Sequence, residues 1–155
     1  MLLRNPEEQD FPRLQALDLE VQRRLDPGFD ALPSREREGR LRSSLPALRF
    51  WQRSEHSLVA ENEGELVGAL LAQSLWQGDR AALWISAIWL AGTAPENCAA
   101  ALLRACTKGA YDAAVYELHL TVGEELAAAA AGEGYQLAGS HGVLYLGQRH
   151  QTAPG

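Results

Sequence analysis

Residues 58–69 read Leu-Val-Ala-Glu-Asn-Glu-Gly-Glu-Leu-Val-Gly-Ala, and this segment indicates the architecture of the sheet. The apolar runs on both sides of Gly64 are typical of two antiparallel strands, because glycine readily adopts the positive φ of a tight hairpin. We predict strands over Ser57–Glu61 and Leu66–Trp76, a turn over residues 77–80, and a third strand over Ala82–Leu90. The third strand is apolar on both faces, which predicts that it is buried in mid-sheet.

The sequence that follows alternates between helical and strand patterns. Thr93 and Glu96 have the spacing of a capping box, so we expect a helix to begin there and to end near residues 109–111. Val115–Val122 alternates apolar and polar side chains, which is typical of a strand covered on one face. Because it follows a strand and a helix, it can pair in parallel with Ala82–Leu90 through a right-handed crossover. We also predict a helix over Glu124–Ala131 and two closing strands over Tyr135–His141 and Gly142–Leu146.

Upstream of the hairpin, the sequence predicts one short strand and then helices. Leu2–Arg4 is the strand candidate. Helical spacing of apolar residues predicts an amphipathic helix over Glu7–Val21. Two further helices are expected over Ser34–Ser43 and after Pro46.

Composition excludes several classes of protein. The chain has 155 residues, 46% of them hydrophobic and 22% charged, which is typical of one globular domain. No apolar run approaches the roughly 20 residues of a membrane helix, and the N-terminus has no apolar signal core. We therefore expect a cytoplasmic protein with no membrane association. The net charge is −6, which argues against nucleic-acid binding because that needs clustered cations.

The two cysteines, Cys98 and Cys106, lie eight residues apart in a predicted helix, which separates them by about 12 Å. That distance is too long for a disulfide bond between them. Neither belongs to a Cys-x-x-Cys pair, so we expect no metal site.

The order of these elements, with three short motifs, resembles the GNAT superfamily of N-acetyltransferases. The motifs are the opening Leu3–Asp10, the hairpin Leu58–Ala69 and the Gly-aromatic step in Gly132–Gly139. The likeness covers Leu2 to Gln148 and is greatest to a small bacterial branch whose function is not established. It implies an α/β fold with a mixed, mostly antiparallel sheet, a central splayed parallel pair, and helices on both faces. We expect one domain over residues 1–148 and a frayed tail over residues 149–155.

The resemblance also implies a function, an acyl-CoA-dependent N-acetyltransferase that acts on a small-molecule or peptide amine. Acetyl-CoA would fit the splay, with its pyrophosphate on the N-terminus of the helix expected at Thr93. The cofactor-binding residues that it implies are Trp89, Leu90, Asn97, Cys98 and Ala99. Trp89 could instead fill the core, as bulky strand aromatics usually do.

Three departures from the family pattern support an alternative interpretation. The segment matching the phosphate loop is Ala94–Ala99, and only Ala99 fits its pattern. Ala130 stands where the family often has a tyrosine acid, and no carboxylate occurs between Arg80 and Glu96 to serve as the base. These losses are typical of a catalytically inactive GNAT-like module for binding or interaction. A third interpretation is a structural partner in a homo- or hetero-oligomer, because a splayed sheet with exposed closing strands would allow a homodimer to form through strand pairing.

The nearest candidates for catalysis are Glu117 and His119, on one face of the predicted strand Val115–Val122. An imidazole suits deprotonation of an amine because it titrates near neutral pH. A strand histidine can equally have a purely structural role, so both interpretations stay open. His56 and His141 are weaker candidates in loops or at strand ends.

Overall fold

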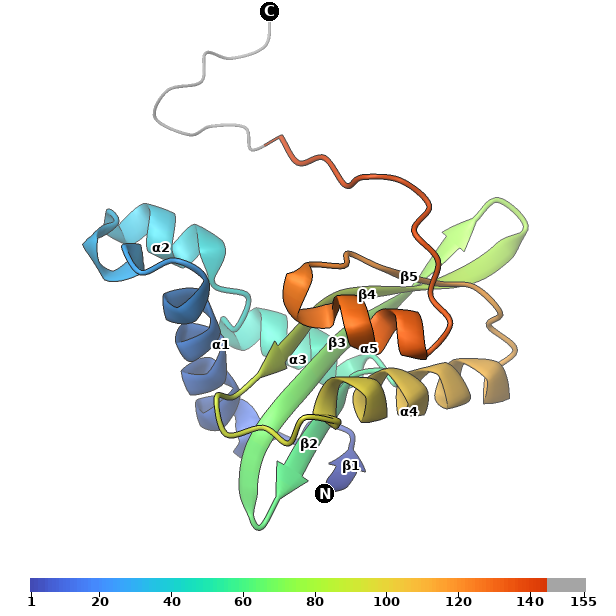
Figure 1. Ribbon diagram of the computed structural model, residues 1–155, viewed down its shortest axis with the longest axis horizontal. Helices are drawn as coiled ribbons and strands as arrows, with labels where there is room; N and C mark the ends of the chain where they lie inside the picture. The colour runs from blue at the N-terminus through green and yellow to red at the C-terminus, as the bar shows by residue number, and fades with distance from the viewer. Residues whose placement is uncertain (145–155) are drawn as a thin grey trace, which may run out of the picture.

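The computed structural model describes residues 1–144, which form a five-stranded sheet with helices on both faces (Figure 1). The strands, in spatial order, are β1 (Leu2–Arg4), β2 (Leu58–Asn62), β3 (Glu65–Gln77), β4 (Arg80–Leu90) and β5 (Leu118–Leu120). The helices are α1 (Phe11–Leu25), α2 (Ser34–Arg40), α3 (Leu45–Arg53), α4 (Cys98–Asp112) and α5 (Glu124–Gly132). Neighbouring strands are antiparallel except β4 and β5, which are parallel as predicted. Within the described residues, no helix is long and apolar enough to cross a membrane.

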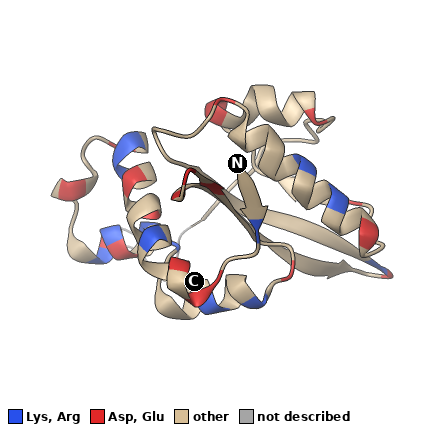
Figure 2. Cartoon of the chain, turned by 90° about the horizontal axis from the view of Figure 1, so that it is seen from below, with Lys and Arg blue, Asp and Glu red and all other residues tan. Residues whose placement is uncertain are grey.

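Alternation along the strands divides the apolar side chains into two cores, one on each face of the sheet. On one face, α1 and α3 pack against β2, β3 and β4; this core contains Phe11, Leu14, Leu17, Val21, Leu48, Val59, Ala69, Leu71 and Trp89. On the other face, α4 and α5 cover a core that contains Ala60, Leu70, Leu83, Ile85, Leu102, Leu103 and Cys106. The charged residues lie mainly on the helices, while the strands carry few (Figure 2).

Strand β5 is shorter than the predicted strand Val115–Val122, because α4 ends in a tight turn. The turn places Ala114 at φ 58, and the Val115 N–H donates to the Ala110 carbonyl at 2.9 Å. The chain therefore leaves the helix end before it can join the sheet at Leu118. Leu118, Leu120 and Val122 still face the α4 core, as the alternation predicted.

The two predicted closing strands are not present in the described residues, since residues 135–144 form no strand. The remainder of the second one, residues 145 and 146, lies outside the described part. Glycine interrupts this segment repeatedly: Gly134 and Gly139 have φ values of 87° and 150°, and Gly142 follows. As a result, the parallel pair β4–β5 lies at the edge of the described sheet rather than at its centre.

A buried carboxylate, Asp10, ties β1 and β2 to the start of α1. It accepts two hydrogen bonds from the Arg4 guanidinium, at 2.7 and 2.9 Å, and one from Arg13 at 2.9 Å. Arg4 also donates to Glu61 on β2 at 3.0 Å. The Arg4 guanidinium holds the pKa of Asp10 below its usual range.

A second buried carboxylate, Asp18, lies between α1 and the loop before α3. Its Oδ2 accepts the Arg42 backbone N–H at 2.7 Å, whereas Oδ1 has no hydrogen-bond partner among the described residues. Burial without a cation in contact raises the pKa of Asp18. The two buried aspartates therefore affect stability in opposite directions as pH changes.

We expect Asp10→Asn and Asp18→Asn to have opposite effects on the free energy of unfolding at neutral pH. Asp10→Asn breaks a buried ion pair and should destabilise the protein by about 3 kcal/mol. Because the folded-state pKa of Asp10 is lowered, this deficit should shrink as pH falls through that pKa. Asp18→Asn keeps the acceptor for Arg42 and removes the cost of a buried charge, so it should stabilise the protein. Because the folded-state pKa of Asp18 is raised, that gain should vanish as pH falls below the unfolded value of about 3.9.

Urea unfolding of the two variants and the parent chain from acid to neutral pH measures both trends. Asp30→Asn is the control, because Asp30 pairs with Arg23 at an exposed site and exposed pairs contribute at most about 1 kcal/mol. If the free energies of unfolding of the three aspartate variants change with pH in the same way, this account of Asp10 and Asp18 is wrong.

Candidate functional site

Strands β4 and β5 separate after only three paired residues. Their register pairs Leu83 with Leu118 and Ile85 with Leu120, where β5 ends, whereas β4 continues to Leu90. Residues 87–90 therefore have a partner on β3 and, among the described residues, none on the β5 side. In parallel sheets, ligands bind outside the carboxyl ends of the strands, and this divergence is at that end.

A β-bulge in β4 coincides with the start of the divergence. Leu71 pairs with Ala87 and Ala72 pairs with Ile85, so Ser86 has no partner on β3. Such a bulge bends its strand and re-aims the adjacent backbone and side chains. Ser86 is exposed and is the first residue of β4 beyond the pairing with β5.

The divergence has apolar walls on its α4 side. Ile88 and Leu90 from β4, with Leu120 and Val122 from the β5 side, pack against the α4 core and remain only partly buried. Partly exposed aliphatic side chains form a surface that suits an acyl chain or another flexible apolar ligand.

Helix α4 begins at Cys98, so the predicted start at Thr93 with its capping box to Glu96 is wrong. The segment before the helix turns twice: the Ala94 N–H donates to the Ala91 carbonyl at 3.0 Å, and the Cys98 N–H donates to the Pro95 carbonyl at 2.9 Å. Proline disfavours the helical conformation of the residue before it, here Ala94, and this favours the turns seen at residues 91–98 over a helix that begins at Thr93. Asn97 is the N-cap residue and makes no side-chain capping bond.

Two backbone amides at this helix start have no hydrogen-bond partner among the described residues. The first helical hydrogen bond runs from the Ala101 N–H to the Asn97 carbonyl at 2.9 Å. Among the described residues, the N–H groups of Ala99 and Ala100 donate to no backbone carbonyl outside the helix and to no side chain. Free amides at the positive end of a helix dipole favour a phosphate or carboxylate.

Gly68 allows α4 to approach the sheet at this point. A Cβ at residue 68 would lie 2.9 Å from Cys98 Sγ, 3.3 Å from Leu102 Cδ1 and 3.4 Å from the Trp89 carbonyl oxygen. Gly68 pairs with Leu90 in the β3–β4 ladder. The first turn of α4 is therefore held directly over the carboxyl end of β4.

The predicted cofactor-binding residues mostly meet in this region, with one exception. Leu90, Asn97, Cys98 and Ala99 lie together at the end of β4 and the start of α4. The Trp89 side chain points to the other face, is 3% exposed and packs into the core under α1. Trp89 therefore fills the core, which was the alternative interpretation of this residue.

The two cysteines are buried, unpaired thiols in the α4 core. Burial raises the pKa of Cys98 and raises that of Cys106 to about 12. A thiol is nucleophilic only as the thiolate, so neither side chain is a nucleophile at neutral pH. Within residues 1–144, no group of three or more potential ligands could hold a metal ion.

Glu117 and His119, which were predicted to share a strand face, form a hydrogen-bonded pair. Glu117 Oε1 and His119 Nε2 are 2.8 Å apart, and Glu117 Oε2 forms an ion pair with Arg80 Nε at 3.2 Å. The imidazole stacks on Trp84, with ring centroids 5.9 Å apart and an interplanar angle of 21°. The pair lies on the face opposite α4, one residue before the parallel pairing ends at Leu120.

Sequence reasoning missed a chain of polar contacts beyond the carboxyl ends of β4 and β5. The Gly92 N–H donates to Glu20 Oε1 at 2.7 Å, Glu20 lies 3.8 Å from Arg24, and Arg24 donates to Glu125 at 3.1 Å. These contacts connect α1 to the loop after β4 and to the start of α5. The i, i+4 spacing of Glu20 and Arg24 predicts an ordinary surface pair, so no local pattern pointed to this bridge.

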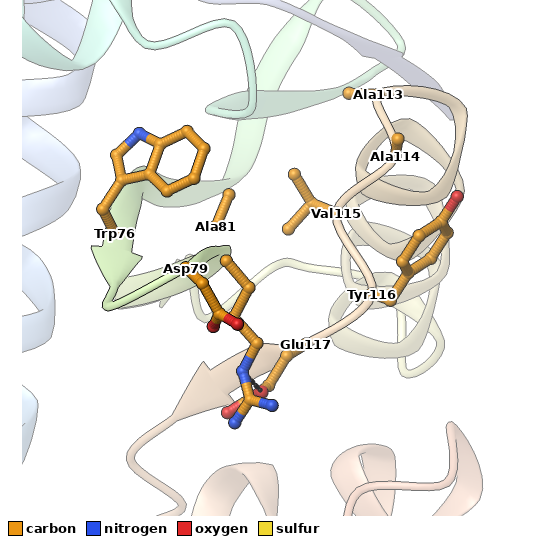
Figure 3. A pocket seen from close by; sticks show the side chains of 9 residues that line it. Trp76, Asp79, Ala81, Ala113, Ala114, Val115, Tyr116 and Glu117 are labelled. Carbon is orange, nitrogen blue, oxygen red and sulfur yellow. Dashed lines mark ion pairs between the residues drawn. The ribbon is translucent and has the colours of Figure 1, made fainter.

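Two shallow hollows in the surface lie elsewhere, on either side of the start of β5. The larger, of about 620 Å³, lies between the β3–β4 turn and the segment after α4; it is lined by Trp76, Asp79, Arg80, Ala81 and residues 113–117 (Figure 3). The smaller, of about 370 Å³, is lined by Thr107, residues 116–118 and residues 133–136. His56 lies in the turn before β2, away from all of these features.

Comparison with known proteins agrees with this architecture. A family model described as "Protein of unknown function (DUF1999)" matches residues 1–155. The crystal structure of wild-type TTHA1254 from Thermus thermophilus has a TM-score of 0.74 and 33% sequence identity, and the match covers 96% of this chain and 100% of that one. No curated protein matches the sequence.

Two more distant structures share the fold. A predicted acetyltransferase from Clostridium acetobutylicum, crystallised with acetyl-CoA, has a TM-score of 0.67 at 12% identity, covering 97% of this chain and 99% of that one. An aminoglycoside antibiotic 6'-N-acetyltransferase from Acinetobacter haemolyticus has a TM-score of 0.62 at 13% identity, covering 97% and 100%. At these identities the likeness shows the GNAT fold alone.

We expect Gly68→Ala to destabilise the protein by about 1–3 kcal/mol, since the new methyl group overlaps Cys98 Sγ in a filled core. Cys98→Ala removes that sulfur, so the double variant should be less destabilised than the sum of the two single variants. Denaturant unfolding of the four proteins measures the coupling.

Gly39→Ala is the matched control, because residue 39 is in helix α2 with nothing within 4 Å of the added methyl. This variant should gain about 0.5–1 kcal/mol from helix propensity. If the effects of Gly68→Ala and Cys98→Ala on the free energy of unfolding are additive, the contact between residue 68 and Cys98 does not limit how closely α4 packs on the sheet.

Proposed function

The chain belongs to the family described as "Protein of unknown function (DUF1999)" and has the GNAT fold, and on this basis we propose that it is an acyl-CoA-dependent N-acetyltransferase. The acceptor is an amine of a small molecule or peptide. The observation that carries the proposal is the divergence of β4 and β5 beside the free amides at the start of α4.

The residues at the divergence fit parts of acetyl-CoA. The amides of Ala99 and Ala100 suit an anionic pyrophosphate, and the partly buried side chains of Ile88, Leu90 and Leu120 suit the apolar arm and the acyl group. The first turn of α4 carries neither a basic nor an acidic side chain, so binding depends on backbone donors. Exposed Glu96, two residues before the helix, adds an unfavourable charge.

Bound acetyl-CoA would supply an acyl group activated as a thioester. The protein's part is to bring the amine to that carbonyl as a free base, because a protonated amine is not a nucleophile. We assign proton acceptance to His119, on the face opposite α4. Glu117 holds the imidazole at 2.8 Å, and Arg80 in turn holds Glu117. The bulge at Ser86 exposes β4 backbone where a donor could stabilise charge on the carbonyl oxygen.

A catalytically inactive binding module is the second candidate, and two observations favour it. Ala130, where a tyrosine acid is common in the family, is 2% exposed and packs in the α4 core. Asn97 stands where the family's phosphate loop has its close-approach glycine, and Pro95 provides no N–H donor. Titration calorimetry with acetyl-CoA separates the candidates, because saturable binding supports the enzyme and no binding at millimolar concentration supports the inactive module.

We expect Glu96→Gln to tighten CoA binding by up to about fivefold, since a carboxylate near a helix N-terminus opposes an anion by about 0.3–1 kcal/mol. Because Glu96 does not cap α4, the melting temperature without ligand should be unchanged. Calorimetry and thermal unfolding with and without CoA measure both effects. Glu63→Gln, in the exposed β2–β3 turn, is the control and should leave both unchanged. If the two variants bind CoA with equal affinity, the pyrophosphate does not bind at the start of α4.

We expect His119→Gln to lower kcat for acetyl transfer by about 10²-fold or more, with a smaller change in KM, because a positioned base contributes about 10²–10⁴-fold. Glu117→Gln should reduce kcat less, since Glu117 only positions the imidazole. The control is His56→Gln, which should retain the parent rate. Acetyl transfer to a panel of amines, followed by release of the free thiol, measures these rates. An unaffected His119→Gln variant would show that the base is another group.

A further inference from the structure

An exposed tryptophan forms one wall of the larger hollow. Trp76, near the end of β3, is 75% exposed, although tryptophan is usually largely buried. Its indole lies on one side of the hollow, with residues 113–115 across from it and Ala81 between them (Figure 3). The Tyr116 ring points away from Trp76 and contacts Tyr111 edge-on, with ring centroids 5.8 Å apart. The indole of Trp76 is therefore the aromatic face that a ligand in the hollow would meet.

The backbone on both sides of the hollow is held in tight turns. The β3–β4 ladder continues to the last residues of both strands, which leaves Gly78 and Asp79 as a two-residue hairpin turn. Gly78 has a φ of 70°, which glycine adopts readily at the first position of such a turn. Across the hollow, Ala114 has a φ of 58° in the turn that ends α4. Trp76 and Asp79 are thus positioned by a strand end and a short turn rather than by a long loop.

The charged groups at the hollow favour a cation. Asp79 and Glu117 bring two carboxylates, whereas Arg80 is the one basic side chain among the described lining residues. Arg80 Nε pairs with Glu117 Oε2 at 3.2 Å, and Asp79 forms no ion pair within residues 1–144. One negative charge is thus left uncompensated, on a chain whose net charge is −6. An anion would be repelled here, and a neutral ligand would gain nothing from Asp79.

The aromatic wall adds a second attraction for the same kind of charge. A cation within about 6 Å of an indole ring centroid is attracted by the negative face of the ring. The aliphatic side chains of Ala81 and residues 113–115 form the other walls and suit a hydrocarbon body. The volume of about 620 Å³ falls within the range of about 300–1,000 Å³ that is usual for small-molecule sites.

We propose that this hollow binds a small organic cation, an ammonium group carried on an apolar body. The charge lies between Asp79 and the face of Trp76, and the apolar body lies against residues 113–115. The hollow is at the amino ends of β4 and β5, whereas these strands diverge at their carboxyl ends. It is therefore separate from the site proposed for acetyl-CoA, and this inference does not depend on the proposed reaction.

NMR titration of the ¹⁵N-labelled full chain tests the proposal, with the backbone amides of Ala81 and Val115 as reporters inside the hollow. The probe is benzyltrimethylammonium, which has no N–H and cannot be acetylated, so the result is independent of acetyl transfer. We expect saturable shifts with a dissociation constant of about 1–10 mM, which is usual for a ligand of this size in an open site. Shifts that do not saturate at tens of millimolar overturn the proposal.

Two ligands with the same ring and a different charge test whether the cation decides binding. Benzyl alcohol is neutral and phenylacetate is an anion. We expect benzyl alcohol to bind about fivefold more weakly than benzyltrimethylammonium, and phenylacetate more weakly still, because the indole and the carboxylate each favour only the cation. Equal affinity for benzyl alcohol, or tighter binding of phenylacetate, overturns the proposal. Tighter binding of a lysine-containing peptide would make the cation a protein side chain and overturn the assignment to a small molecule.

Trp76→Leu and Asp79→Asn locate the bound cation. Each should weaken binding of benzyltrimethylammonium by about 2–5-fold, as expected for one cation–π contact or one ion pair at an exposed site. Both side chains are exposed and asparagine suits a turn, so the melting temperatures should match that of the parent chain. Phe50→Leu and Asp30→Asn are the matched controls, an exposed aromatic residue and an exposed carboxylate outside the hollow, and should bind as the parent does. Parental affinity in both Trp76→Leu and Asp79→Asn would place the cation elsewhere and overturn the proposal.

Discussion

Helix α4 can lie against the sheet only because residue 68 has no side chain. The space that a Cβ would occupy is already filled by the sulfur of Cys98 and by Leu102. This contact fixes the first turn of α4 over the end of β4. The position of that helical turn sets the direction of the unpaired amides of Ala99 and Ala100. The opening between β4 and β5 is thus bounded by a helix whose height above the sheet is set at a single glycine. A rigid boundary of this kind lets a site be built from backbone groups, which cannot adjust by changing rotamer.

The balance of charge around this opening is unusual for a site that would bind a polyanion. The chain carries a net charge of −6, and the helix start itself has no basic side chain in its first turn. The nearest cation in the chain of contacts at the strand ends is Arg24, and it is engaged by Glu20 and Glu125. An anion would have to rely on amide dipoles, unless it also drew Arg24 away from its two carboxylates. Affinity would then depend strongly on ionic strength, because both the binding and the competing pairs are exposed to salt.

Much of the fold could be predicted from the sequence, because its local signals agree with its tertiary structure. The turn at Gly64, the two-faced apolar strand β4 and the helix–strand order led to the correct sheet order and to the parallel pair. The face of β5 that packs against α4, and the placement of Glu117 and His119 on the opposite face, followed from strand alternation alone. The predictions were wrong where the sequence pattern favoured a helix or strand but a proline or glycine favoured another backbone conformation. Thr93 and Glu96 have the spacing of a capping box, but the turn at Pro95 delays the helix to Cys98. The segment after Tyr135 has apolar residues for a strand, yet it forms no strand among the described residues, where Gly139 has a φ of 150°. Contacts such as Glu20 to Gly92 join residues far apart in the chain and have no signature that one sequence could reveal.

The pairing of β1 with β2 has a consequence for synthesis of the chain. β1 is made first, but its partner residues 59–61 lie beyond three helices, and Arg4 reaches Glu61 only when that strand is in place. At about 5–20 residues per second, the first strand waits on the order of 3–10 seconds for its neighbour to be translated. Arg4 and Asp10 are close in sequence and can pair during this interval, before any sheet exists. Three residues offer too short an edge to recruit another nascent chain, so the delay carries little risk of misassembly on a polysome.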